Sequence, residues 1–131
     1  MKKILLIESN QSILENFTEY FEKEGFEIIS ARNGTTGVAM ARKCEPDLII
    51  SEIQLHGIDG YEVLRLIIKK FSTSCIPFIF CTTKCEAIDK TNAMDLGADD
   101  FIVKPVSLEL LNVMANTWIT AGSRRPTCVL A

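Results

Sequence analysis

Residues 3 to 10 read Lys3-Ile-Leu-Leu-Ile-Glu-Ser-Asn10, a continuous apolar run that ends abruptly in polar side chains. A strand with one face in water alternates apolar and polar residues, whereas a strand buried on both faces is apolar throughout. Four further runs of the second kind lie at residues 26–30, 47–50, 77–81 and 100–103. The sequence therefore predicts five strands of a parallel sheet that is covered on both faces.

The segments between these runs have the spacing of amphipathic helices. The first helix is expected to end at Gly25, and its apolar face consists of Ile13, Leu14, Phe17, Tyr20 and Phe21. Three more helices are expected at residues 34–43, 60–71 and 87–96. The last helix follows an N-cap at Ser107, and its apolar face consists of Leu111, Met114, Ala115 and Trp118. Strand and helix thus alternate five times. Because such crossovers are right-handed, we predict a doubly wound α/β domain with a helical layer on each face of the sheet.

Length and charge limit the functions to consider. A chain of 131 residues and 14.6 kDa is expected to form one domain around one core. Its hydrophobic fraction of 47% and charged fraction of 24% are typical of globular proteins. With a net charge of −3, the chain lacks the basic surface that attracts nucleic acid or anionic membranes. We therefore expect no nucleic-acid partner and no membrane partner.

Neither an export signal nor a membrane span is evident in the sequence. The first apolar run stops at Glu8, short of the roughly 7 to 15 apolar residues in a signal peptide. The uncharged stretches 71–83 and 110–123 are too short and too polar to cross a bilayer, which takes roughly 20 apolar residues. We therefore expect a cytoplasmic protein.

The cysteines show no metal-binding or disulfide pattern. They are Cys44, Cys75, Cys81, Cys85 and Cys128. Their number is odd, no two have C-x-x-C spacing, and the one histidine, His56, is expected in a solvated loop. We expect reduced thiols, with Cys81 in the core and Cys85 at a helix start rather than as a redox pair.

The end of the chain has no recognisable pattern. We place the domain at residues 1–122 and expect residues 123–131 to form a frayed, disordered tail in which Arg124 and Arg125 are solvated.

Polar side chains follow four of the predicted strands. In open α/β sheets, sites form outside the carboxyl ends of the strands, where the strand order reverses. The residues at these ends are Glu8, Ser9 and Asn10, then Ser51 and Glu52, then Thr82 and Thr83, then Lys104 and Pro105. Each alone is an ordinary loop residue or helix cap, but together they predict a shallow cleft that holds two carboxylates, hydroxyls and one ammonium.

Several motifs resemble those of the response-regulator receiver domain, from Lys2 to about Ile119. They are Lys3-Ile-Leu-Leu-Ile-Glu-Ser-Asn10, Pro46-Asp-Leu-Ile-Ile-Ser-Glu52, Asp59-Gly-Tyr-Glu62, Pro77-Phe-Ile-Phe-Cys-Thr82 and Gly97-Ala-Asp-Asp-Phe-Ile-Val-Lys-Pro105. The resemblance implies a flavodoxin-like (βα)5 sandwich with strand order 2-1-3-4-5, and a role in bacterial two-component or phosphorelay signalling. In that family a histidine kinase phosphorylates one aspartate with the help of Mg²⁺.

The sequence departs from the family pattern in the cleft. The phosphoacceptor position holds Glu52, the acidic pair after the first strand reads Glu8-Ser9, and the usual Met-Pro reads Leu55-His56. The family positions for the metal are Ser9, Glu52 and Gln54. Other positions keep residue types that the family uses. They are the switch positions Thr82 and Phe101 and the lysine after the fifth strand, Lys104. The resemblance also implies a cis peptide bond before Pro105.

These departures predict a weakened site. Mg²⁺ prefers carboxylate and water oxygens in an octahedron, so Ser9 leaves at most a weak metal site and we expect no cofactor. Phosphoryl transfer depends on positioning, and Glu52 carries its carboxylate one methylene further than aspartate would. We therefore expect the self-catalysed transfer to be lost and the chain not to act as an enzyme.

One hypothesis is that a Glu52–Lys104 ion pair, with Thr82 as hydroxyl donor, fixes one conformation of the domain. The alternative is an ordinary ion pair of little consequence.

Two main functions remain open. The first is a pseudo-receiver that binds a protein, a sensor histidine kinase or a downstream signalling protein, through the face of its fourth helix, fifth strand and fifth helix. The chain after Pro105 is too short for an output domain, so output is expected to pass through a partner or a larger protein. The second is a Mg²⁺-dependent receiver with an unusual acceptor such as Glu8 or Asp59. A flavin or nucleotide binder is disfavoured because the loop from Glu8 to Ser12 has no glycine-rich cradle.

Overall fold

A computed structural model describes residues 1–84 and 86–129, which form a five-stranded parallel sheet and six helices. The strands are β1 (Lys3–Ile7), β2 (Glu27–Ala31), β3 (Leu48–Ser51), β4 (Phe78–Thr82) and β5 (Asp100–Val103). Their order is β2-β1-β3-β4-β5, and every neighbouring pair is parallel. The predicted flavodoxin-like strand order is therefore confirmed.

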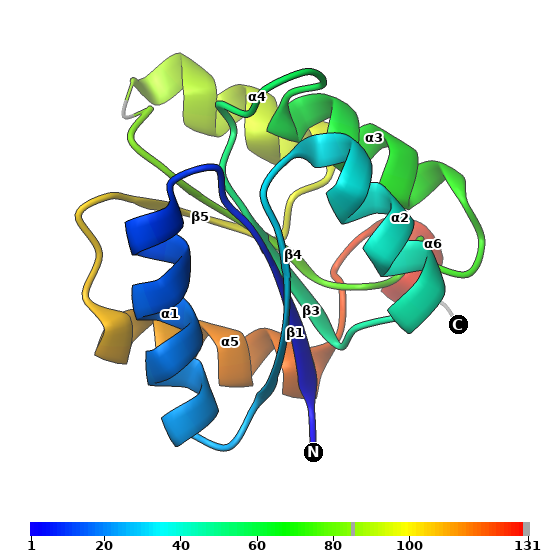
Figure 1. The fold of residues 1–131 in the computed structure, drawn as a ribbon. Coiled ribbons are helices and arrows are strands. Elements are labelled where there is room, and N and C mark those ends of the chain that lie inside the picture. The colour runs from blue at the N-terminus through cyan, green and yellow to red at the C-terminus, as the bar shows by residue number, and fades with distance from the viewer. Residues whose placement is uncertain (85, 130–131) are drawn as a thin grey trace.

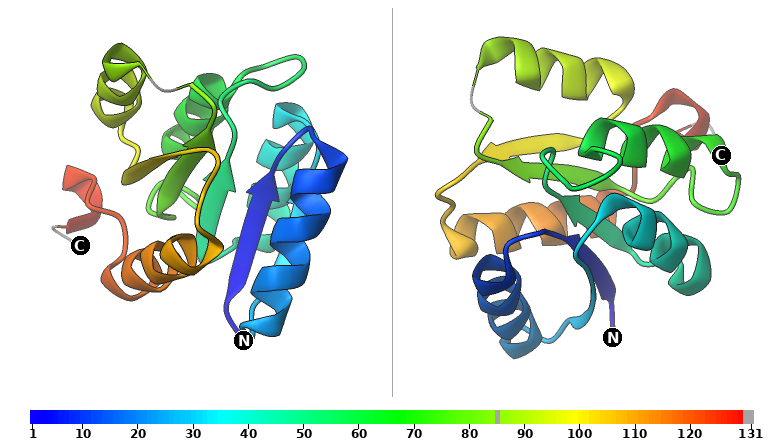
Figure 2. Two further views of the ribbon diagram at one scale, coloured as in Figure 1. Left: turned by 90° about the vertical axis from the view of Figure 1, so that its left-hand side faces the viewer. Right: turned by 45° about the horizontal axis from the view of Figure 1, so that its top comes forward.

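Helices cover both faces of this sheet, as Figure 1 shows. They are α1 (Gln11–Lys23), α2 (Gly34–Cys44), α3 (Gly60–Lys69), α4 (Ala87–Leu96), α5 (Leu108–Ala121) and a short α6 (Pro126–Val129). The right-hand view of Figure 2 shows α3 and α4 above the sheet and α1 and α5 below it. The result is the predicted three-layer sandwich.

Four of the six helices in the described residues begin after a side chain that caps them. Asn10, Asn33, Asp59 and Ser107 each accept a hydrogen bond from a backbone N–H of the first turn that follows. α1 stops just before Gly25, whose φ of +96° favours glycine. α3 ends at Lys69 rather than at residue 71 as predicted, because Lys70 has an extended backbone.

Two apolar layers lie on opposite faces of the sheet, and β1 contributes to both. Leu5 and Ile7 pack into the layer under α2, α3 and α4, whereas Ile4 and Leu6 pack into the layer under α1 and α5. All four are almost completely buried. This explains why the strand is apolar throughout and does not alternate.

The prediction of a frayed tail is wrong for residues 123–129. Ser123 and Arg125 are buried, and α6 follows them. The physical reason is that Asp99 and three backbone carbonyls accept hydrogen bonds from this segment. Arg124 is exposed, as predicted, but its backbone N–H is bound to Asp99.

The prediction that all cysteines are reduced is also wrong. Cys75, before β4, and Cys128, in α6, form a disulfide. Cys81 is buried in the core as predicted, Cys44 is half-buried, and both are free thiols. Cys85 lies outside the described residues. In the described part of the chain, no helix has both the length and the apolar character needed to span a membrane.

Candidate functional site

The carboxyl ends of β1, β3, β4 and β5 bring the predicted polar residues to one edge of the sheet. Glu8 directly follows β1, Glu52 follows β3, Thr82 ends β4 and Lys104 follows β5. After β1 the chain crosses to the face covered by α1 and α5, and after β3 it crosses to the face covered by α2, α3 and α4. In the strand order β2-β1-β3-β4-β5, a crevice forms between β1 and β3 for this reason. Residues from distant parts of the sequence therefore meet here.

Lys104 lies between the two glutamates. Its Nζ donates to Oε2 of Glu52 over 2.8 Å and also to Oε1 of Glu8. No more than a tenth of any of the three side chains is exposed to solvent. The predicted Glu52–Lys104 contact is confirmed. The bond to Glu8 was not predicted from the sequence, although Glu8 lies at the neighbouring strand end.

The remaining carboxylate oxygens of the cluster are held by the backbone. Oε1 of Glu52 accepts the N–H groups of Ile53 at 2.7 Å and of Gln54 at 3.3 Å. Oε2 of Glu8 accepts the N–H of Asn10 at 3.0 Å. Each of the four carboxylate oxygens thus has a donor within the protein, and the two glutamates are fixed from both sides.

The electrostatics of the cluster favour a charged lysine. Burial works against the ammonium charge of Lys104, but its hydrogen bonds to Glu52 and Glu8 outweigh burial and raise the pKa of Lys104. Nearby, burial raises the pKa of Cys81 to about 12 against the opposing effect of Lys104, so its thiol is neutral at pH 7. Lys104 is therefore charged at pH 7, whereas the Cys81 thiol is neutral.

Thr82 adjoins the cluster through its backbone, whose carbonyl accepts the N–H of Lys104 at 2.8 Å. The Thr82 hydroxyl is buried and accepts the N–H of Lys84 at 3.1 Å. Within the described residues it makes no hydrogen bond to Glu52, so the predicted donor role is not seen. Phe101 packs in the apolar layer under α2, α3 and α4 with 9% of its surface exposed. The bond before Pro105 is cis, as the resemblance implied.

The other predicted metal positions, Ser9 and Gln54, line one pocket together with Ile53, the residue after Glu52. Ser9 is half-buried, and its backbone carbonyl accepts a hydrogen bond from Arg32 at 2.8 Å. The Gln54 side chain is exposed beside His56, which lies in the solvent as predicted. In residues 1–84 and 86–129, no three His, Cys, Asp or Glu side chains are grouped as metal ligands. Lys104 already binds both carboxylates, and their other oxygens accept backbone N–H groups.

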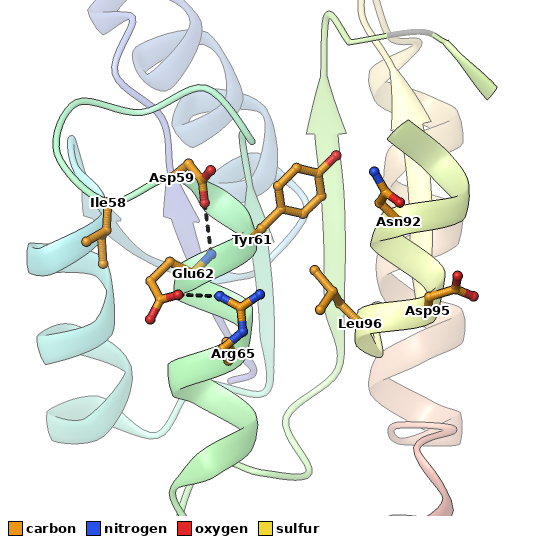
Figure 3. Close-up of a pocket in the computed structure, with 8 residues that line it drawn as sticks. All are labelled: Ile58, Asp59, Tyr61, Glu62, Arg65, Asn92, Asp95 and Leu96. Carbon is orange, nitrogen blue, oxygen red and sulfur yellow. Dashed lines mark hydrogen bonds and ion pairs between the residues drawn. The ribbon is translucent and has the colours of Figure 1, made fainter. Parts of the chain in front are cut away.

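A separate groove lies between α3 and α4, as Figure 3 shows. Tyr61 extends across it, packs edge-on against Phe80 of β4, and donates to the carbonyl of Asp89 in α4 at 3.4 Å. Asp59, at the edge of the groove, accepts the N–H of Glu62 at 2.9 Å and so caps α3. The suggested alternative acceptors thus both have structural partners: Asp59 at the helix cap and Glu8 at Lys104.

Comparison with known proteins matches this architecture to one family. The model of the response regulator receiver domain matches residues 4–116. PilH of Pseudomonas aeruginosa is 36% identical over 111 residues, which cover 85% of this chain and 92% of PilH. The transcriptional regulatory protein AfsQ1 of Streptomyces coelicolor is 33% identical over 97% of this chain, which spans only 55% of AfsQ1.

Solved structures agree with the sequence comparison. The chemotaxis response regulator CheY4 of Vibrio cholerae is 26% identical with a TM-score of 0.82, over 88% of this chain and 98% of CheY4. The signal receiver domain of a histidine kinase from Syntrophus aciditrophicus is 28% identical with a TM-score of 0.86, over 95% of each chain. The chain belongs to the family of response regulator receiver domains.

Proposed function

We propose that this chain is an atypical receiver of a two-component system, in which Glu52 stands at the phosphoacceptor position and Lys104 holds the site closed without phosphorylation. The observation that carries this proposal is the set of hydrogen bonds on Glu8 and Glu52. Every carboxylate oxygen accepts a bond from the protein, and Lys104 joins the two side chains. An incoming phosphoryl donor would therefore have to compete with Lys104 and with the backbone N–H groups for these oxygens.

The chemistry of the site supports the loss of phosphoryl transfer. In-line transfer needs a placed nucleophile and neutralisation of the charge that develops on the phosphoryl oxygens. Here the Glu52 carboxylate bends back onto the N–H groups of its own loop, and Ser9 supplies a hydroxyl in place of a second acid after β1. Self-catalysed phosphorylation is therefore absent in this proposal, and Mg²⁺ binds weakly or not at all.

Output by protein contact is supported by the surface of α4, β5 and α5. Among the described residues, large apolar side chains are exposed on all three elements: Met94 on α4, Val103 on β5, and Leu110 and Val113 on α5. In this proposal these side chains form one continuous apolar surface, the kind that marks protein-binding sites. The proposed partner is a sensor histidine kinase or a downstream signalling protein that covers this face.

Backbone amide NMR spectra test the proposal. Spectra of the chain alone, with Mg²⁺, and with Mg²⁺ plus beryllofluoride, a phosphoryl analogue, should coincide at Glu8, Glu52 and Lys104. The double variant Ser9→Asp/Glu52→Asp is the matched control, because it restores the family's acids in the same fold. Saturable shifts in the unaltered chain that spread to Thr82 and Phe101 would instead mean a working phosphoryl switch.

A further inference from the structure

The segment after α5 is bound to the sheet through Asp99, the residue before β5. Oδ1 of Asp99 accepts the Ser123 hydroxyl at 3.1 Å and the N–H of Arg124 at 2.8 Å. Oδ2 accepts the N–H of Phe78, at the start of β4, at 3.0 Å. This region is at the opposite end of the strands from Lys104, so the segment has no part in the candidate site.

Arg125 ties the same segment to the loop between α3 and β4. Its Nε donates to the carbonyl of Ser74 at 3.0 Å, and its Nη2 donates to that of Ile76. Its Nη1 donates to the carbonyl of Gly97 at 3.0 Å and to Asp99 at 3.2 Å. Burial lowers the pKa of Arg125 and Asp99 opposes this effect, so the guanidinium depends on these acceptors.

These bonds place two cysteines side by side. Ser74 and Ile76, which Arg125 contacts, are the residues on either side of Cys75. Cys128 lies one turn beyond Arg125, and its N–H donates to the Arg125 carbonyl at 2.8 Å. The Cα atoms of Cys75 and Cys128 are 5.5 Å apart, in the usual range for a disulfide. Arg125 therefore raises the effective concentration of one thiol at the other.

We propose that Cys75 and Cys128 form a reversible redox site that fastens α6 to the loop between α3 and β4. A thiolate of one cysteine attacks a low-molecular-weight disulfide and releases one thiol, leaving a mixed disulfide. The second cysteine attacks that bond and releases the second thiol, so two protein thiols are oxidised while one small disulfide is reduced to two thiols. Excess small thiol reverses both steps.

The exposure of the two cysteines and the shortness of α6 both support a reversible bond. Cys75 is exposed and Cys128 is half-buried, so a small thiol reaches the bond. The four-residue α6 is too short to persist as a helix without an anchor. Reduction therefore releases α6, while Arg125 and Asp99 keep the preceding residues bound.

The fastened segment also shapes the surface beside the end of α4. A groove there is lined by Met94 and Asp95 of α4, by Trp118 of α5, and by Arg125 and Pro126. Pro126 begins α6, so release of α6 removes one wall of this groove. The redox state of two cysteines is thereby linked to the shape of the α4–α5 side of the molecule.

A redox titration of the full chain tests the proposal. The protein is equilibrated in buffers of varied glutathione to glutathione-disulfide ratio, the thiols are alkylated, and the Cys75–Cys128 peptide is quantified by mass spectrometry. Arg125→Ala should lower the equilibrium constant for the disulfide by about tenfold or more, because several bonds of a charged donor are lost. Arg124→Ala, at the exposed neighbour, is the matched control and should stay within about twofold of the unaltered chain.

Two further measurements keep the test decisive. Arg125→Lys, which keeps the charge but cannot reach all four acceptors, replaces Arg125→Ala if that variant unfolds, and should also lower the constant. On reduction, amide hydrogen exchange should rise at Cys128 and Val129 and stay constant at Ile53. The proposal is overturned by free thiols at every ratio, by a different cysteine pairing, or by Arg125 variants that match the unaltered chain.

Discussion

Nζ of Lys104 lies 2.8 Å from Oε2 of Glu52, although the two residues are 52 positions apart in the sequence. The same nitrogen also binds Glu8. One lysine after β5 thus joins the carboxyl ends of β1 and β3, the two strands between which the chain reverses direction across the sheet.

Replacement of this lysine should destabilise the fold. Lys104→Ala leaves two buried carboxylates without their common counter-charge, and breaking a buried ion pair from one side costs about 3–5 kcal/mol of unfolding free energy. Urea denaturation at pH 7 measures this loss. Lys69→Ala, at an exposed position in the last turn of α3, is the control and should change the unfolding free energy by less than about 0.5 kcal/mol.

The same variant separates a conformational role from a merely local ion pair. If the Lys104 contacts fix the conformation of the domain, amide shifts in Lys104→Ala should extend from Glu8 and Glu52 to Thr82, Phe101 and the exposed face of α4. Shifts confined to the residues that touch Lys104 would show an ordinary ion pair. They would contradict the proposal that the Lys104 contacts fix the conformation of the domain.

The unfolding free energy should fall at alkaline pH because Lys104 loses its proton. The pKa of Lys104 in the folded chain lies above its ordinary value of 10.5, so the folded state holds this proton more tightly than the unfolded state. The contribution is therefore complete well below pH 10.5 and is lost as the pH rises through the folded-state pKa. Denaturation from pH 8 to 11 should show the unaltered chain converging on Lys104→Met; a constant difference over that range would contradict this linkage.

The sheet and its site edge were predictable because their signals are local. Each strand is a short apolar run, and α1, α2, α3 and α5 each follow a capping residue, such as Asn33 or Ser107. Strand order then decides which loop residues meet. Glu8, Glu52 and Lys104 were placed together by this reasoning, and the structure brings them together.

The partners of each side chain were less predictable. Glu8 and Lys104 are 96 positions apart, and nothing near either residue indicates that Lys104 binds both glutamates. The tail was missed for the same reason. Its anchors, Asp99 and the carbonyl of Ser74, are 26 and 51 positions from Arg125. A backbone carbonyl occurs at every residue, so no residue type in the sequence identifies Ser74 as a partner. Without these contacts, Arg124-Arg125 reads as a solvated pair.

Restoring the phosphoacceptor alone should not restore phosphorylation. Glu52→Asp shortens the side chain but leaves Ser9 without a carboxylate, so Mg²⁺ remains poorly held. We expect no labelling of Glu52→Asp by a small phosphodonor such as acetyl phosphate, and measurable labelling of Ser9→Asp/Glu52→Asp by intact mass. Strong labelling of the single variant would show that Ser9 does not limit the reaction.

Removal of one disulfide cysteine should lower stability only under oxidising conditions. The bond closes a loop between residues 53 positions apart, which restricts the unfolded chain and stabilises the fold by about 2–4 kcal/mol. Without added thiol, Cys75→Ser should therefore unfold at lower urea concentration than the unaltered chain. Cys44→Ser, at a free thiol, is the control and should behave like the unaltered chain. With excess thiol the unaltered chain should lose its advantage; a deficit of Cys75→Ser that persists there would assign the effect to packing around Cys75 and not to the bond.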